Sequence, residues 1–145
     1  MNTLADLNGT KWSGSAELWV DPLGDNVAHS ACKLFIESDG VRYNWNQEGQ
    51  EQTGQVTLYD NSAVFTDTWH QPDEMKCQHL EGEWGLFQIE GRYGPQLEWG
   101  WRIGLSYRTP TSELVLQMTN IAPWGEEARA VRMVCQQIDP VNVTG

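Results

Sequence analysis

The chain has 145 residues, of which 39% are hydrophobic, and a formal net charge of −11 from 20 acidic and 9 basic residues. This length fits one domain with a sizeable core, and the acidic balance excludes a protein that holds nucleic acid or an anionic membrane through a basic surface. No apolar run approaches the roughly 20 residues of a membrane-spanning helix, and eight tryptophans argue against disorder.

In chain order, short alternating runs separated by Gly, Asp, Asn and Pro predict about ten strands. These runs span residues 11–20, 31–36, 41–46, 53–59, 62–70, 75–80, 84–93, 99–107, 113–119 and 128–138. The clearest is 99–107, where five large side chains alternate with charged, small or glycine positions and therefore share one face: Trp99, Trp101, Ile103, Leu105 and Tyr107. Gly94-Pro95 predicts the turn before it.

The short connections favour an all-β fold, a single antiparallel up-and-down barrel of about ten strands, over a sandwich with long crossovers. Closure would also remove the exposed strand edges of such a sheet. We expect residues 1–145 to form one domain, with residues 1–8 and 139–145 frayed or lid-like.

The first residues and the cysteines predict a cytoplasmic protein. Residues 1–8 lack the basic and apolar segments of a secretion signal. Cys32, Cys77 and Cys135 are odd in number and too far apart for a clustered zinc site. We therefore expect three reduced thiols and no metal or other cofactor.

Three parts of the chain resemble known barrels. Leu7-Asn-Gly-Thr-Lys-Trp12 resembles the glycine–tryptophan start of calycins, which include lipocalins and fatty-acid-binding proteins, with one extra residue between Gly9 and Trp12. Residues 69–77, 95–103 and 118–121 are similar to a bacterial domain-of-unknown-function family with a calycin-like barrel. The resemblance implies that Trp12 closes one end of the barrel beneath a basic side chain of the last strand, Arg132 or alternatively Arg129.

Aromatic side chains provide the candidate ligand site, because a barrel of this size can enclose one small molecule. The candidate lining residues are Tyr43, Trp45, Trp69, Trp99 and Trp101, with His70, His79 and Asn120 as polar groups that orient a ligand. Arg102 lies on the other face of its strand from Trp101 and would meet a carboxylate only if that face turned inward.

Three functions stay open. The favoured one is a soluble binding protein that holds a small apolar or amphipathic molecule in an aromatic-lined cavity. The second is a cofactorless enzyme of the isomerase or decarboxylase type, which the calycin resemblance allows, although no catalytic residue is assigned. The third is a structural homo-oligomer, such as a homodimer, with a filled core. A measured cavity separates the first two functions from the third.

Overall fold

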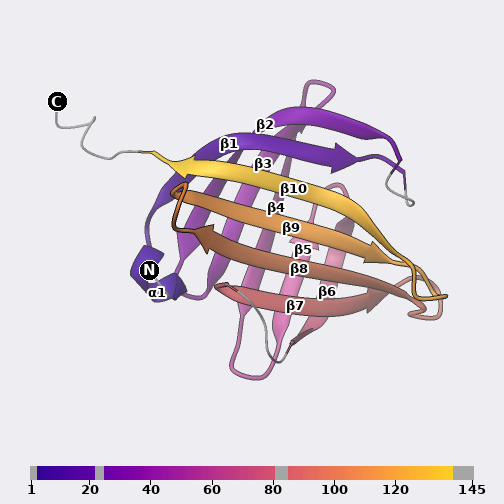
Figure 1. The fold of residues 1–145 in the computed structure, drawn as a ribbon. Coiled ribbons are helices and arrows are strands. Elements are labelled where there is room, and N and C mark those ends of the chain that lie inside the picture. Colours follow the sequence, from indigo (N-terminus) through magenta and orange to yellow (C-terminus); the bar gives the residue numbers. More distant parts are fainter. Residues whose placement is uncertain (1–2, 22–24, 81–84, 139–145) are drawn as a thin grey trace, which may run out of the picture.

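The computed structural model describes residues 3–21, 25–80 and 85–138. In these residues ten antiparallel strands close into one up-and-down barrel, and the only helix is a single turn, so the predicted fold class is confirmed (Figure 1). The elements are α1 (Leu4–Leu7), β1 (Lys11–Trp19), β2 (Val27–Glu37), β3 (Gly40–Gln47), β4 (Gln50–Leu58), β5 (Ala63–Asp67), β6 (Gln71–His79), β7 (Phe87–Tyr93), β8 (Trp99–Arg108), β9 (Glu113–Ile121) and β10 (Glu127–Gln137).

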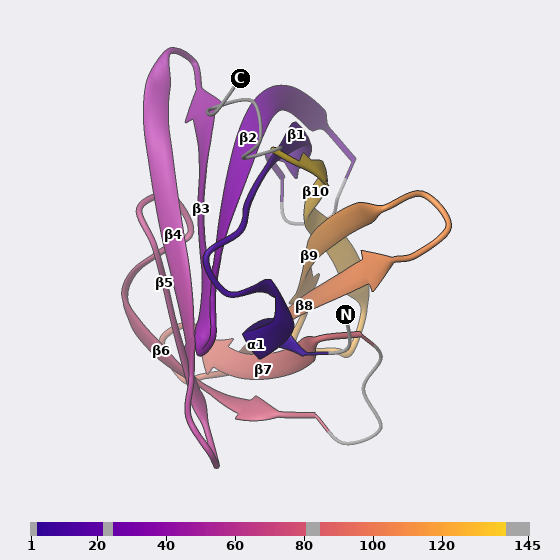
Figure 2. The ribbon, with the colours of Figure 1, turned by 90° about the vertical axis from the view of Figure 1, so that its left-hand side faces the viewer.

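Each strand pairs with its neighbours in the sequence, and β1 pairs with β10 to close the barrel. Strands β1 and β7 to β10 form one side, and β3 to β6 cross steeply behind them (Figure 1). The barrel has two different ends. The helix end carries α1, and Figure 2 shows α1 lying across the opening there. The open end carries the turns β5–β6, β7–β8 and β9–β10.

The helix end is filled by side chains. Leu4 and Leu7 of α1 are buried, so this part of the N-terminal segment is packed and not frayed, which agrees with the lid-like alternative. The expectation for residues 139–145 lies outside the described residues. Trp12 is 1% exposed and meets the edge of Tyr107 at a centroid separation of 6.0 Å. Four of the five alternating side chains of β8, Trp101, Ile103, Leu105 and Tyr107, pack in or against the core, as its sequence predicts, whereas Trp99 is only partly buried and lies outside this core. Aromatic and aliphatic residues therefore form one continuous core below the open end.

The predicted partner of Trp12 is wrong. Arg132 lies opposite Glu17 in the β1–β10 ladder and on the outer face, where its guanidinium is 3.6 Å from the Glu17 carboxylate. The alternative, Arg129, lies over the ring of Trp19 at 4.8 Å. Trp12 points inward and instead donates its indole N–H to Thr10 Oγ1 at 2.9 Å. Residues that lie opposite each other in a ladder share a face, so Arg132 lies on the same outer face as Glu17. Successive residues of a strand face opposite sides, and Trp12 is on the inward face of β1.

The boundary between β5 and β6 also differs from the sequence prediction. The predicted strand 62–70 ends at Asp67, and the predicted break at residues 71–74 belongs to β6. The Asp67 carboxylate accepts the backbone N–H groups of Trp69 and His70 and so ends β5 in a turn. Pro72 fits in β6 because no ladder pair with β7 is formed before Cys77.

Candidate functional site

Four aromatic side chains meet at the open end, and we name them the aromatic cluster: Trp45, Trp69, His70 and Trp101. Trp45 comes from β3 and Trp101 from β8, whereas Trp69 and His70 lie in the β5–β6 turn. The His70 ring centroid is 4.6 Å from that of Trp69, 5.0 Å from that of Trp101 and 5.9 Å from that of Trp45. The structure thus brings together four of the side chains that the sequence proposed for a ligand site.

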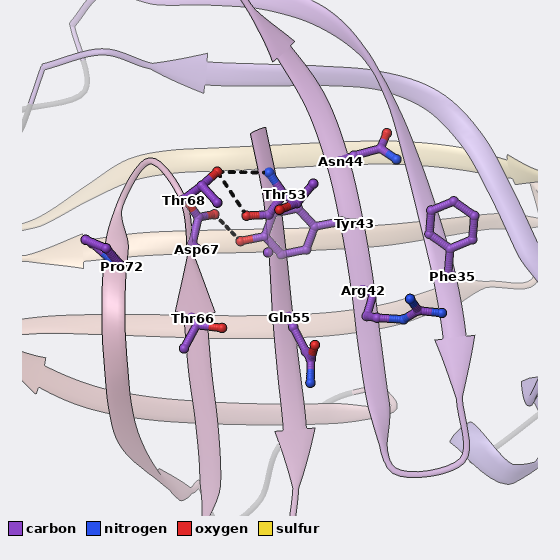
Figure 3. A pocket seen from close by; sticks show the side chains of 11 residues that line it. Phe35, Arg42, Tyr43, Asn44, Thr53, Gln55, Thr66, Asp67, Thr68 and Pro72 are labelled. Carbon is purple, nitrogen blue, oxygen red and sulfur yellow. Dashed lines mark hydrogen bonds between the residues drawn. The ribbon is translucent and has the colours of Figure 1, made fainter. Parts of the chain in front are cut away.

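Asp67 holds the turn that presents two of these rings. Its Oδ1 accepts the backbone N–H of Trp69 at 2.6 Å and that of His70 at 2.7 Å. Its Oδ2 accepts a hydrogen bond from the Tyr43 hydroxyl, as Figure 3 shows. His70 Nδ1 lies 3.5 Å from Oδ1, which is longer than an ordinary hydrogen bond. Tyr43, Asp67 and His70 form a continuous polar chain inside an apolar barrel.

The charge state of this chain follows from its contacts. Burial by itself raises the pKa of the Asp67 carboxyl, but His70 and the Tyr43 hydroxyl outweigh burial and hold that pKa below its ordinary value of 3.8. Burial, followed by the negative charge of Asp67, raises the pKa of Tyr43 well above its ordinary range. Asp67 is therefore a carboxylate and Tyr43 a neutral hydrogen-bond donor at neutral pH.

Gly54 of β4 allows this contact to form. Tyr43, Gly54 and Asp67 lie in one row across β3, β4 and β5. A Cβ at Gly54 would lie 2.1 Å from Cζ of Tyr43, so only glycine lets the ring cross β4 (Figure 3). Tyr43 also stacks on Trp45 with a centroid separation of 5.5 Å. Tyr43, which the sequence proposed as a ligand contact, thus supports the cluster from the side, and neither Tyr43 nor Trp45 lines the inner or the outer cavity.

Two adjoining cavities lie at the open end, and His70, Tyr93 and Trp101 line both. The inner cavity has a volume of about 120 Å³, and its lining is completed by Phe65, Gln71 and Met75. The outer cavity has a volume of about 320 Å³, and its lining is completed by Trp19, Val20, Asp21, Trp69, Asn120, Arg129 and Ala130. A molecule bound in either cavity would therefore contact these three side chains.

Three nitrogen atoms in the cluster are buried without a hydrogen-bond partner among the described residues: Trp45 Nε1, His70 Nδ1 and Trp101 Nε1. Leaving a buried polar group unpaired costs roughly 1–3 kcal/mol. His70 Nδ1 still has the Asp67 carboxylate 3.5 Å away, so the two indole N–H groups are the unpaired donors. Most buried polar groups in proteins are paired, so two unpaired donors in one cluster are unusual. Trp101 lines both cavities, whereas Trp45 lines neither.

Asn120 and Trp99 take different places around the outer cavity. Asn120 is 6% exposed, lines the cavity and accepts a hydrogen bond from the Tyr93 hydroxyl. Burial raises the pKa of Tyr93, so this hydroxyl keeps its proton. Trp99 lies further out, with its ring centroid 6.2 Å from Tyr93 and 5.9 Å from the exposed Trp124. Asn120 is thus a wall of the cavity and Trp99 part of the rim.

His79 does not belong to this site. Its ring Nε2 lies 2.9 Å from the carbonyl oxygen of Tyr59 and 3.0 Å from that of Ser62, at the helix end. His70 precedes β6 and His79 is its last residue. A strand rises about 3.3 Å per residue, so they are separated by roughly the length of the barrel wall. His79 closes the β4–β5 turn.

Arg102 faces outward and cannot meet a ligand inside the barrel. Its guanidinium makes two contacts of 3.0 Å with Glu127 and one of 3.3 Å with Glu90. Its hydrogen bonds with Glu127 raise the pKa of Arg102 and lower that of Glu127. The outer cavity is lined instead by the cation Arg129, which the sequence considered only as a partner for Trp12.

Two larger hollows lie outside the cluster. One, of about 610 Å³, is on the outer face of β2 to β5 and is lined largely by polar side chains, among them Arg42, Thr53 and Gln55 (Figure 3). The other, of about 690 Å³, lies between β6 and β7, whose ladder has three residue pairs. Gln71, Met75 and Tyr93 line both this gap and the inner cavity. The inner cavity therefore adjoins the gap as well as the open end.

The sequence missed Asp67, Tyr93, Trp19 and Arg129 as members of this region. The inward position of Asp67 could have been predicted from the sequence, because Asp67 continues the alternation of the inward residues Ala63 and Phe65. Nothing local distinguished Arg129 from the other arginines.

No cluster of three or more His, Cys, Asp or Glu side chains suited to a metal ion occurs in the part of the chain that the structure describes. None of its helices has the length and apolar character needed to cross a membrane. No family model matches the chain, and neither a curated protein nor a solved structure gives a significant match. The resemblance to calycins and to the bacterial family stays a prediction.

Proposed function

We propose that the chain binds one small, ring-containing molecule at the open end of its barrel. The observation that carries this proposal is the position of His70, Tyr93 and Trp101 between two adjoining cavities. Ligand sites are typically apolar and aromatic with a few polar groups that fix orientation. Here the rings supply the apolar walls, and His70 and Asn120 supply polar groups.

The volumes favour a short ligand over a long acyl chain. The inner cavity, at about 120 Å³, is close to the roughly 150 Å³ of an apolar cavity that accepts benzene. Below it the interior is occupied by side chains such as Phe65, Ile103 and Leu114, each 0% exposed. A ligand with one ring would fit the inner cavity and extend a polar substituent into the outer one. This is the amphipathic class that the sequence favoured.

Titration with small phenyl compounds tests the proposal. Tryptophan emission should change and saturate near one molecule per chain, because Trp69 and Trp101 line the outer cavity. Trp101→Ala should weaken binding at least about tenfold, which corresponds to about 1.4 kcal/mol. Trp124→Ala is the matched control, because Trp124 is 67% exposed and lines neither cavity. The proposal is wrong if no phenyl compound saturates or if Trp101→Ala binds like the parent.

The chain Tyr43–Asp67–His70 favours acid–base catalysis as a second candidate function. A histidine beside a buried carboxylate and next to a cavity is an arrangement that orients a general base. Under this alternative, a bound compound would be recovered chemically altered. His70→Ala would abolish turnover and leave affinity nearly intact, whereas in a binding protein the bound compound is recovered unchanged and His70→Ala lowers affinity alone.

We also propose that the protein works in a reducing compartment such as the cytoplasm. Cys32, Cys77 and Cys135 are buried and free. The sulfur atoms of Cys32 and Cys135 are 3.5 Å apart, well beyond the roughly 2.05 Å of a disulfide. Thiols persist in this form where the surroundings keep them reduced.

A further inference from the structure

Arg129 lines the outer cavity next to an irregularity in β10 and lies opposite Thr119 in the β9–β10 ladder. The register of the β9–β10 ladder shifts between Arg129 and Val131, which leaves Ala130 buried. Such a bulge re-aims the side chains on either side of it. The guanidinium of Arg129 lies 4.8 Å from the ring centroid of Trp19, and both residues line the outer cavity. A cation over an indole face is attracted to it, so Trp19 helps to hold the guanidinium at this position.

Arg129 has no carboxylate partner among the described residues. Of the other five arginines, four lie within 4.0 Å of a carboxylate oxygen: Arg42, Arg92, Arg102 and Arg132. The chain has 20 acidic and 9 basic residues, so carboxylates are abundant relative to cations. A guanidinium that is held in place but unpaired, beside an aromatic cavity in an acidic chain, is available to an external anion.

Among the residues that line the outer cavity, Asp21 is the one whose negative charge would repel a bound anion. Its carboxylate accepts the backbone N–H of Asp25 at 2.9 Å and that of Asn26 at 2.6 Å. These bonds commit Asp21 to the β1–β2 connection. The remaining neighbours of the cavity on β7 to β9 are Tyr93, Trp101 and Asn120, which are uncharged.

We infer, on the basis of the function proposed above, that the ligand is a small aromatic carboxylate. Its ring lies against Tyr93 and Trp101, and its carboxylate meets the guanidinium of Arg129 at the mouth. Arginine presents parallel N–H donors that match the two oxygens of a carboxylate. The neighbouring rings exclude water from one side of the pair, which strengthens the attraction.

An aromatic cavity also attracts cations, so a cationic ligand is the competing class. Here Arg129 already lies over one of the aromatic faces. A second cation at the mouth would be repelled by the guanidinium, whereas an anion would be attracted. The two classes therefore predict opposite orders of affinity for one series of compounds.

Phenylacetate, phenylacetamide and phenylethylamine form such a series, because they share a ring and differ in charge. At pH 7.5 we expect the protein to bind phenylacetate about tenfold tighter than phenylacetamide, and phenylethylamine weakest. Arg129→Gln should remove the preference for the acid and leave the affinity for the amide unchanged. Arg132→Gln is the matched control on the same strand, because Arg132 faces outward and pairs with Glu17. Asp21→Asn should increase the affinity for the acid and leave that for the amide unchanged.

The outcomes separate this inference from the function on which it rests. Equal binding of the acid and the amide would overturn the anionic class and leave a ring-binding site in place. Tightest binding of the amine, or an acid preference that survives in Arg129→Gln, would also overturn it. Failure of all three compounds to bind would overturn the proposed function together with the inference.

Discussion

The two ends of the barrel use the same residue types in opposite ways. At the helix end, Trp12 is 1% exposed and its N–H is bonded to Thr10. At the open end, Trp45 and Trp101 are 1% and 6% exposed, yet their N–H groups have no partner in the described residues. A tryptophan with a satisfied N–H contributes its full burial to stability, whereas an unpaired one loses part of it.

The two histidines of β6 and its preceding turn repeat this contrast. His79 at the helix end lies against two backbone carbonyl oxygens of the β4–β5 turn. His70 at the open end lies among aromatic rings and lines both cavities. The helix end thus pairs the indole N–H of Trp12 and the imidazole Nε2 of His79, whereas the open end leaves two indole N–H groups unpaired among the described residues, at some expense in stability.

Trp12→Ala should have the largest effect on stability. Removal of a fully buried aromatic ring typically costs about 3–5 kcal/mol. Trp69→Ala should cost less, because Trp69 is only partly buried. Urea denaturation of both variants measures the difference between the two ends. Because Arg132 and Trp12 lie on opposite faces, Arg132→Ala and Trp12→Ala should be additive, and a strong coupling would place them in contact after all.

Asp67→Asn should be the most destabilising polar change at the open end. It removes the charge from hydrogen bonds with Tyr43 and two backbone N–H groups, each charged bond being worth roughly 1.5–3 kcal/mol. Because the pKa of Asp67 is lowered by folding, its contribution is present above the ordinary value of 3.8 and is lost as the pH falls below it.

Urea midpoints of the parent and Asp67→Asn at pH 7 and pH 3 measure this contribution. The gap between the two proteins should be wide at pH 7 and narrower at pH 3. A gap that is the same at both values would show that the carboxylate charge contributes nothing to folding.

Gly54→Ala should destabilise the open end by about 1–3 kcal/mol, the usual range for overpacking. The new Cβ would lie 2.1 Å from the Tyr43 ring and would displace it from Asp67. Gly104→Ala is the matched control, because a Cβ there meets its nearest atom at 3.7 Å. Thermal unfolding should separate the two variants, and equal melting temperatures would contradict the crossing of Tyr43 over β4.

His70→Ala and His79→Ala should separate binding from stability with the smallest changes. His70→Ala should lower several-fold the affinity for a phenyl compound that binds the parent protein, because His70 lines both cavities. His79→Ala should leave that affinity unchanged and lower the free energy of unfolding by about 1 kcal/mol, the usual value of one hydrogen bond. Tryptophan emission and urea denaturation give the two readouts. Weaker binding in His79→Ala alone would reverse the assignment of the two ends.

The sequence by itself determined the strands and most of their inward faces. Alternation of large and small residues is a local signal with a period of two, and it correctly placed four side chains of β8 in or against the core, with Trp99 the exception. The Gly94-Pro95 turn was equally local, and Gly94 adopts a φ of 98° there. The error at β5–β6 arose because Asp67 ends its strand through its side chain, within a run that otherwise alternates.

Only the tertiary structure decided which end of the barrel each residue occupies and what it meets there. His70 and His79 looked equivalent in the sequence, but the length of β6 puts them at opposite ends. The sequence considered Arg102 for a ligand carboxylate and Arg129 only as a partner for Trp12, but contacts with Glu90 of β7 and Glu127 of β10 occupy Arg102, whereas Arg129 lines the outer cavity. The row of Tyr43, Gly54 and Asp67 depends on the registers of two ladders. Register and closure join residues far apart in the chain, and a local pattern contains no information about either.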